Sequence, residues 1–169
     1  LYESRNNICT HPGDTIYVDT GTYSLLKNIN LTALHQGIRI QGPASRAAVL
    51  DRDLTESGSY AFQFLNADDV TLDSLTITGA LYGVFAPSGS DSDRVTISNC
   101  EIADNLRRGI YLQTSNDAWQ ILDNIVHDHL GIAGNIVDGT GLTLESANDL
   151  VIRGNTIFEN DQAGIRLIG

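Results

Sequence analysis

The stretch VTISNCEIADNLRRGIYL, Val95 to Leu112, decides the fold, because its pattern of apolar residues recurs three more times in the chain. The four copies occupy residues 70–86, 95–112, 119–144 and 150–167, so their starts lie 25, 24 and 31 residues apart. Internal repeats of this length indicate a solenoid, in which each copy forms one turn and buries its apolar face against its neighbours.

Each copy contains three short segments in which apolar residues alternate with others, as in a strand whose successive side chains face opposite sides. The third segment opens with a glycine in every copy. The inward positions of the quoted copy are Val95, Ile97, Cys100, Ile102, Ile110 and Leu112. Three inward pairs per copy predict a triangular coil, and the sequence therefore predicts an all-β parallel β-helix solenoid of about six coils with three short parallel sheets. A leucine-rich repeat fits less well, because no apolar run of useful length has a helical period.

Further residues identify a family resemblance. The opening Pro12-Gly13-Asp14-Thr15-Ile16, the turn Gly21-Thr22-Tyr23 and the later Val-Thr-Ile, Asn and Gly-Ile rows resemble right-handed parallel β-helix proteins of the pectate-lyase-like superfamily. The resemblance covers about residues 12–169 and implies the right-handed coil. We expect an irregular segment over residues 1–12 that leads into one β-helix domain, residues 13–169, cut from a longer protein.

The charge of the chain excludes some partners. Twenty-one acidic residues against ten basic ones give a net charge of −11, which repels nucleic acids and anionic membrane surfaces. No apolar run reaches membrane-spanning length, so we expect neither nucleic-acid binding nor membrane insertion.

The chain has two cysteines, Cys9 and Cys100. Cys100 occupies an inward position several coils from Cys9, and coils rise by roughly 4.8 Å each, which is too far for a disulfide. We expect Cys100 to be a buried, unreactive thiol.

The outward residues of the third segment form the most ligand-like surface of the predicted solenoid. Aromatic rings can stack on sugars, while amide, carboxylate and guanidinium groups can bind hydroxyls or a uronate. The alternative is an ordinary solvated face. The candidate ligand-binding residues are Phe85, Tyr111, Gln113, Glu145 and Arg166, with His129 beside them.

The third copy is longer than its neighbours, and we place the insertion from His127 to Thr140, beside this surface. His127 with Asp128 or Glu145 could supply acid and base groups near neutral pH, which makes these three the candidate catalytic residues. His129 would help to wall the site. The alternative is a solvated loop with surface histidines.

An acidic column precedes the first segment of successive copies, at Asp68, Asp93 and Asp117. Stacked carboxylates repel one another, so a calcium ion could bind there. Asx turns explain the same residues and are the favoured interpretation. No cofactor is required by this reading.

The superfamily resemblance implies a sugar-polymer ligand, polysaccharide or oligosaccharide, without fixing an activity. The acidic and histidine motifs of pectate lyases, polygalacturonases and mannuronan epimerases are not found in this sequence. The first hypothesis is an extracellular, cell-surface or periplasmic module that recognises carbohydrate, with or without lyase- or epimerase-like activity. The second is a noncatalytic spacer or adhesin segment of a larger surface protein. In both, further coils or a partner cover the open C-terminal sheet edge.

Overall fold

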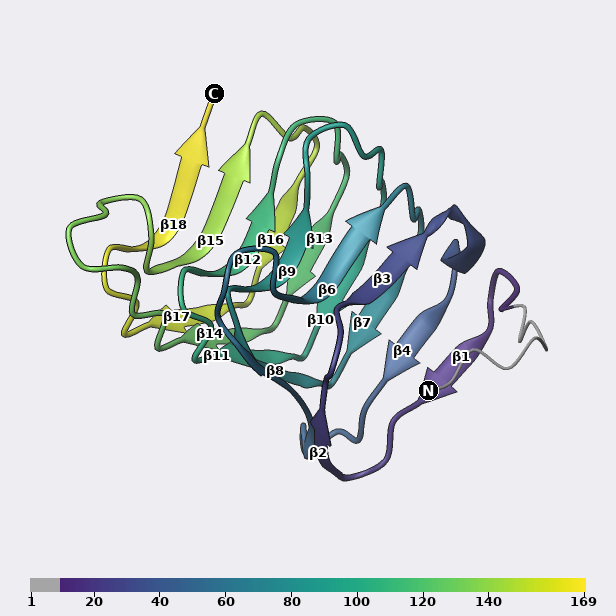
Figure 1. The fold of residues 1–169 in the computed structure, drawn as a ribbon. Coiled ribbons are helices and arrows are strands. Elements are labelled where there is room, and N and C mark those ends of the chain that lie inside the picture. Colours follow the sequence, from purple (N-terminus) through teal and green to yellow (C-terminus); the bar gives the residue numbers. More distant parts are fainter. Residues whose placement is uncertain (1–9) are drawn as a thin grey trace.

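The computed structural model describes residues 10–169, and these form one solenoid of six coils (Figure 1). Each coil contributes one strand to each of three parallel six-stranded sheets, so strands that are neighbours in a sheet lie three strands apart in the sequence. The predicted all-β fold, the three sheets and the six coils are confirmed. The expected segment over residues 1–12 lies mostly outside the described residues, and the first strand begins at Thr15.

We name the sheets A, B and C in the order in which the chain meets them. Sheet A contains β1 (Thr15–Tyr17), β4 (Arg39–Gln41), β7 (Thr71–Asp73), β10 (Thr96–Ser98), β13 (Gln120–Leu122) and β16 (Val151–Arg153). Sheet B contains β2 (Gly21–Ser24), β5 (Ala48–Leu54), β8 (Thr76–Ala80), β11 (Glu101–Ala103), β14 (Ile125–His127) and β17 (Thr156–Phe158). Sheet C contains β3 (Ile29–Thr32), β6 (Tyr60–Leu65), β9 (Tyr82–Ala86), β12 (Arg108–Leu112), β15 (Thr140–Glu145) and β18 (Ala163–Ile168). A short 3₁₀ helix, η1 (Ala33–His35), follows β3.

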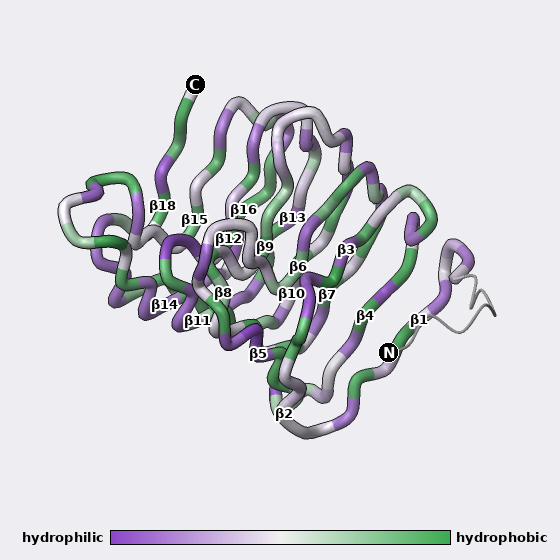
Figure 2. Tube along the Cα trace, in the orientation of Figure 1, coloured by the Kyte–Doolittle hydropathy of each residue, from purple (hydrophilic) through white to green (hydrophobic). Residues whose placement is uncertain are grey.

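The register of the strands is the one that the repeats predict. In sheet A, Leu72, Ile97 and Ile121 pair in line, and in sheet C, Val84, Ile110 and Leu142 do the same. Hydrophobic and hydrophilic residues alternate along the strands in coil after coil (Figure 2). In the middle coils the inward columns are almost completely excluded from solvent, and their burial supplies the main free energy that holds the coils together.

Polar residues at the corners hold neighbouring coils in line. Asn124 accepts a 2.9 Å hydrogen bond from the backbone NH of Cys100, and its amide donates to the carbonyl of Ile97. Asn155 repeats the arrangement one coil further along. Each amide satisfies backbone groups that the turn leaves without partners, so these asparagines stabilise the corners. Cys100 in this column is buried and is a free thiol among the described residues, as the sequence predicts.

One segment leaves the stack. Residues 130–139, which we call the strap, connect β14 to β15 and project beside β18 (Figure 1). The strap is the insertion that lengthens the third sequence copy. Leu130, Ile132 and Ile136 on it are exposed.

Candidate functional site

The outer face of sheet C carries the predicted ligand-binding residues in the expected register. Tyr111 lies between Phe85 and Thr143 on neighbouring strands, and Arg166 follows Thr143. Glu145 lies on the same face, on β15. The sequence therefore located this column of side chains correctly.

The burial of the column differs from the expectation. Phe85 and Tyr111 are each only 8% exposed, and Thr143 is fully buried. The aromatic rings cover one another: the ring centres of Phe85 and Tyr111 are 5.3 Å apart, and Tyr82 packs edge-on against Tyr111 at 5.2 Å. Tyr60 and Leu106 pack around them. A second small apolar core thus lies outside the sheet, and flat ring faces are not open to solvent.

Arg108 joins this aromatic cluster. Its guanidinium lies 4.0 Å from the ring centre of Tyr111 and 5.3 Å from that of Tyr82, a distance at which a cation is attracted to the ring face. Its side chain is 8% exposed, and the carboxylate of Asp138 lies 3.8 Å away. The positive charge is therefore held between two rings and one carboxylate.

Polar groups at the edge of the cluster are also ordered. The hydroxyl of Tyr111 donates a 2.6 Å hydrogen bond to Oε1 of Glu145. The amide of Gln113 donates to Oε2 of Glu145 at 3.1 Å and to the Tyr111 oxygen at 2.9 Å. Burial, and next the hydrogen bond to Glu145, raise the pKa of Tyr111 to about 12, although Arg108 acts in the opposite direction. Glu145 and Gln113 remain half-exposed and form the accessible polar rim of this face.

The strap is anchored to this face through Asp138, whose side chain is 1% exposed. One carboxylate oxygen lies 3.1 Å from Nε of Arg107, and the same oxygen accepts a 2.5 Å hydrogen bond from Asn135. Arg166 adds a second anchor, because Nη1 donates to the carbonyl of Ile136 at 3.0 Å. Three arginines therefore meet the strap: Arg107 and Arg108 through the buried carboxylate of Asp138, and Arg166 through the carbonyl of Ile136.

Of the predicted catalytic residues, His127 and Asp128 are brought together, but Glu145 lies apart from them. His127 belongs to β14 and not to the inserted loop, so it lies on the outer face of sheet B, whereas Glu145 lies on sheet C. The expectation that His127 lies beside the ligand-binding column of sheet C was wrong. Strand β14 continues in register through His127, and the chain leaves the stack only after this residue.

His127 and Asp128 do form a pair on sheet B. Nδ1 of His127 lies 2.6 Å from a carboxylate oxygen of Asp128, and Nε2 lies 3.3 Å from Glu101 on the preceding coil. The ring stacks on Phe158 of the next coil with centres 4.8 Å apart. Burial disfavours the charged ring, but the hydrogen bonds to the two carboxylates outweigh it, so the pKa of His127 lies above its ordinary value. The arrangement ties three coils together.

His129 is fully buried and does not present its ring to a ligand, contrary to the expectation. Nδ1 accepts a 3.2 Å hydrogen bond from the backbone NH of Asn105, just as Asn105 accepts one from the NH of Ala80 one coil earlier. The ring fits because Gly109 has no side chain: a Cβ there would collide with Nε2 of His129. Burial lowers the pKa of His129 to about 4. His129 is therefore a neutral corner residue in the position of an asparagine.

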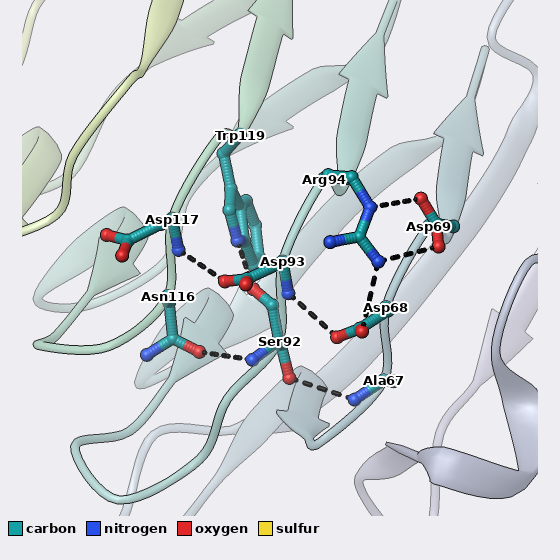
Figure 3. Close-up of polar contacts among 9 residues, drawn as sticks. All are labelled: Ala67, Asp68, Asp69, Ser92, Asp93, Arg94, Asn116, Asp117 and Trp119. Carbon is teal, nitrogen blue, oxygen red and sulfur yellow. Dashed lines mark hydrogen bonds and ion pairs between the residues drawn. The ribbon is translucent and has the colours of Figure 1, made fainter.

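The acidic column is a hydrogen-bonded ladder (Figure 3). The carboxylate of Asp68 accepts a 3.0 Å hydrogen bond from the NH of Asp93, and Asp93 accepts one of 2.8 Å from the NH of Asp117. Arg94 reaches back to Asp68 and Asp69; its hydrogen bond to Asp69 holds the pKa of that carboxyl below its usual range.

These carboxylates do not surround a common point. Across residues 10–169, no three His, Cys, Asp or Glu side chains lie close enough to hold a metal ion. One carboxylate oxygen each of Asp68, Asp93 and Asp117 accepts a hydrogen bond from a backbone NH of the next coil instead. These bonds join residues 24 to 31 positions apart, so the carboxylates form a ladder between coils rather than the local Asx turns that the sequence favoured.

Sequence reasoning missed the central part played by Arg107 and Arg108. Both precede the glycine that opens the third segment, at a position that the repeat pattern assigned to neither face. Two successive arginines immediately before this glycine were the available signal.

A family model described as a right handed beta helix region matches residues 3–134 and 61–169. The two matches together cover almost the whole chain, and the chain belongs to this family. No curated protein and no solved structure gives a significant match. Within the described residues, no helix is long and apolar enough to cross a membrane.

Proposed function

We propose that the outer face of sheet C, with the strap beside it, binds an acidic polysaccharide outside the cell or at its surface. The observation that carries the proposal is the local charge. Three of the ten basic residues of the chain, Arg107, Arg108 and Arg166, gather at a face where Asp138 and Glu145 supply the carboxylates, although the net charge of the chain is −11. This local gathering of arginines in an acidic chain favours an anionic ligand there.

The polar rim supplies the groups that a uronate needs. Arg166 is half-buried and has donors beyond the one used by Ile136, and a guanidinium can bind a carboxylate through two parallel hydrogen bonds. Gln113 and Glu145 can bind hydroxyl groups next to it. Because Phe85 and Tyr111 are largely covered, polar contacts contribute more to this binding than ring stacking does.

The proposal is recognition and not turnover. An acid–base mechanism needs its groups within hydrogen-bonding reach of one substrate atom. Here the His127–Asp128 pair belongs to sheet B and Glu145 to sheet C, so the three do not form one catalytic group.

A matched pair of arginine variants tests the proposal. Arg166 and Arg153 both belong to the last coil, but Arg153 lies on sheet A and is exposed. With oligogalacturonate and oligoalginate as probes in calorimetric titrations, Arg166→Ala should weaken binding by about tenfold or more, and Arg153→Ala should change it by less than about twofold. Affinity should also fall as salt is added. Equal loss in the two variants, or no binding of either probe by the unmodified protein, would overturn the proposal.

A second candidate function is a structural spacer or adhesin segment. The observation that favours it is that the sheet C face is largely self-satisfied, with its rings packed together and Glu145 already paired to Tyr111 and Gln113. The last coil also presents inward-register residues to solvent: Ile165 is 43% and Leu167 74% exposed. We propose that further coils or a partner cover this edge. Sedimentation of the chain alone distinguishes this function, because an uncovered apolar edge predicts concentration-dependent association without any glycan.

A further inference from the structure

We propose a second ligand site, for a neutral sugar, in a hollow at the corner between sheets A and B of the first two coils. The hollow has a volume of about 330 Å³ and is lined by residues 17–20 of the first coil and 41–44 of the second. We call it the corner hollow. It is formed by the ends of β1 and β4 in sheet A and by the corner residues that follow them. It shares no residue with the sheet C face, so it goes beyond the function proposed above.

The hollow exists because two neighbouring corners differ in length. The backbone NH of Val18 bonds to the carbonyl of Gln41, and the NH of Gly21 bonds to that of Ala47. Two residues therefore turn the corner in the first coil, between these bonds, while five turn it in the second. The longer corner must extend beyond the shorter one, and the space beside the shorter corner is the hollow.

The longer corner is held firmly. The NH of Arg46 closes a turn on the carbonyl of Pro43 at 2.8 Å, the hydrogen bond of a β-turn. The guanidinium of Arg46 donates a 2.6 Å hydrogen bond to the carbonyl of Asn99, and the Arg46 carbonyl accepts one from Thr76 at 2.7 Å. Gly42 packs so closely that a Cβ would collide with the carbonyl of Ser74. A wall fixed at four points keeps the hollow formed before a ligand arrives, which lowers the entropic cost of binding.

The lining residues match the chemistry of a sugar ring. Tyr17 is 75% exposed and pairs directly with Gln41 across the two coils, so an open aromatic ring stands next to an amide. Oε1 of Gln41 accepts a hydrogen bond from Arg39 at 3.0 Å, which orients the amide and leaves its NH₂ group to donate to a ligand. Tyr23 steadies the shorter corner by donating to the carbonyl of Asp19 at 3.0 Å.

The charge of the hollow selects against acidic ligands. Asp19 is exposed and is the one charged residue among the eight that line the hollow. A carboxylate in a protein of net charge −11 accepts hydrogen bonds from hydroxyl groups but repels a uronate. The volume lies at the small end of ligand pockets, which run from about 300 to 1,000 Å³. The corner hollow therefore suits one or two neutral sugar units, whereas the sheet C face suits an acid.

A matched pair of sugars tests the inference. Methyl galactoside and methyl galacturonate share one ring and differ at C6, which carries an alcohol in the first and a carboxylate in the second. In titrations followed by amide NMR shifts, methyl galactoside should move the signals of residues 17–20 and 41–44, and methyl galacturonate should leave them in place. Tyr17→Ala should weaken galactoside binding by about tenfold. Leu26→Ala, an exposed apolar change in the same coil, should leave the affinity unchanged.

The carboxylate of Asp19 can be replaced by a neutral amide of nearly the same shape. Asp19→Asn should let methyl galacturonate into the hollow, with shifts on the same amides. The inference is overturned if methyl galactoside moves no signal of the hollow, if the galacturonate binds there as well as the galactoside does, or if Tyr17→Ala changes nothing while circular dichroism shows the fold intact. Failure of the sheet C proposal would appear separately, as loss of the Arg166-dependent binding of oligouronates.

Discussion

The hydroxyl of Tyr111 lies 2.6 Å from Oε1 of Glu145, a residue 34 positions later in the chain and one coil further along the solenoid. A hydrogen bond to a carboxylate is shorter and stronger than one between neutral groups. Because Gln113 donates to the other carboxylate oxygen, both oxygens of Glu145 are held by hydrogen bonds. The two coils are thus joined outside the sheet as well as through its backbone ladder.

Replacement of Tyr111 by phenylalanine should lower the free energy of unfolding by about 1–2 kcal/mol, because it removes this hydrogen bond and leaves the ring in place. Urea unfolding measures the change. Tyr60→Phe is the control: Tyr60 packs in the same cluster, and its hydroxyl has no hydrogen-bond partner among the described residues, so the expected change is close to zero. A similar decrease in the free energy of unfolding in both variants would show that the hydrogen bond from Tyr111 to Glu145 does not stabilise the fold.

The sequence predicted the coils and their register because the inward positions keep the same spacing within each strand segment, although the copies differ in length. Ile97, Ile102 and Ile110 each have an apolar equivalent in every regular copy, and a one-residue error would have turned all of them outward. The order of the faces followed from this register, including the alignment of Phe85, Tyr111 and Arg166.

The burial of the site could not be predicted in the same way. Whether Tyr111 faces water depends on side chains that differ from copy to copy, namely Tyr82 and Arg108, and the inward apolar pattern does not predict their packing. His127 was misplaced for a related reason: the copy lengths show that residues are inserted but not where β14 ends. The corner hollow was missed because the first two coils are irregular, and the two corner lengths can be compared only after their register is known.

Cys100 should react with a thiol reagent only after unfolding. The residue is fully buried, and burial raises the pKa of its thiol to about 12, with Asp73 acting in the same direction. The reactive thiolate is therefore scarce as well as inaccessible. In a Cys9→Ser background, labelling of the native protein should proceed no faster than global unfolding, and urea should bring it to completion. Rapid labelling without urea would show that this column is not inward.

Two histidines should give the stability opposite dependences on pH. The pKa of His129 falls to about 4 in the fold, against an ordinary value of 6.5. Between these values the unfolded chain binds a proton that the native protein does not, so the contribution of His129 is present above pH 6.5 and is lost as the pH falls toward 4. His129→Asn, which copies Asn105 of the preceding coil, should reduce this loss of stability at acidic pH. The free energy of unfolding, measured with urea at several pH values, tests this.

His127 should act on the alkaline side. Its pKa is raised in the fold, so the native protein holds its proton more tightly than the unfolded chain does. The contribution of His127 is therefore complete below pH 6.5 and is lost as the pH rises through the raised value. His127→Gln should remove this loss and leave the loss of stability at acidic pH unchanged. If the loss of stability at acidic pH persists in His129→Asn, that loss belongs to other groups. The same holds for the loss at alkaline pH if it persists in His127→Gln.

Asp138 should determine whether the strap stays closed. The carboxylate is 1% exposed between Arg107 and Arg108, and the removal of one member of a buried charge cluster leaves the others uncompensated, at a cost of about 3–5 kcal/mol. In Asp138→Asn we expect this cost to appear as opening of the strap, because the six coils retain their own core. Hydrogen exchange of amides 131–139 should accelerate while the amides of β9 and β12 stay protected.

Asp104→Asn is the matched control, since Asp104 is exposed on the corner that precedes the same arginines, and it should leave the exchange of the strap unchanged. Unaltered protection of residues 131–139 in Asp138→Asn would show that the backbone bonds from Gly131 and Gly139 to Leu106 and Arg107 hold the strap without the carboxylate. If the strap does open, Arg166 loses its bond to Ile136, and the affinity for oligogalacturonate should change in that variant and not in Asp104→Asn.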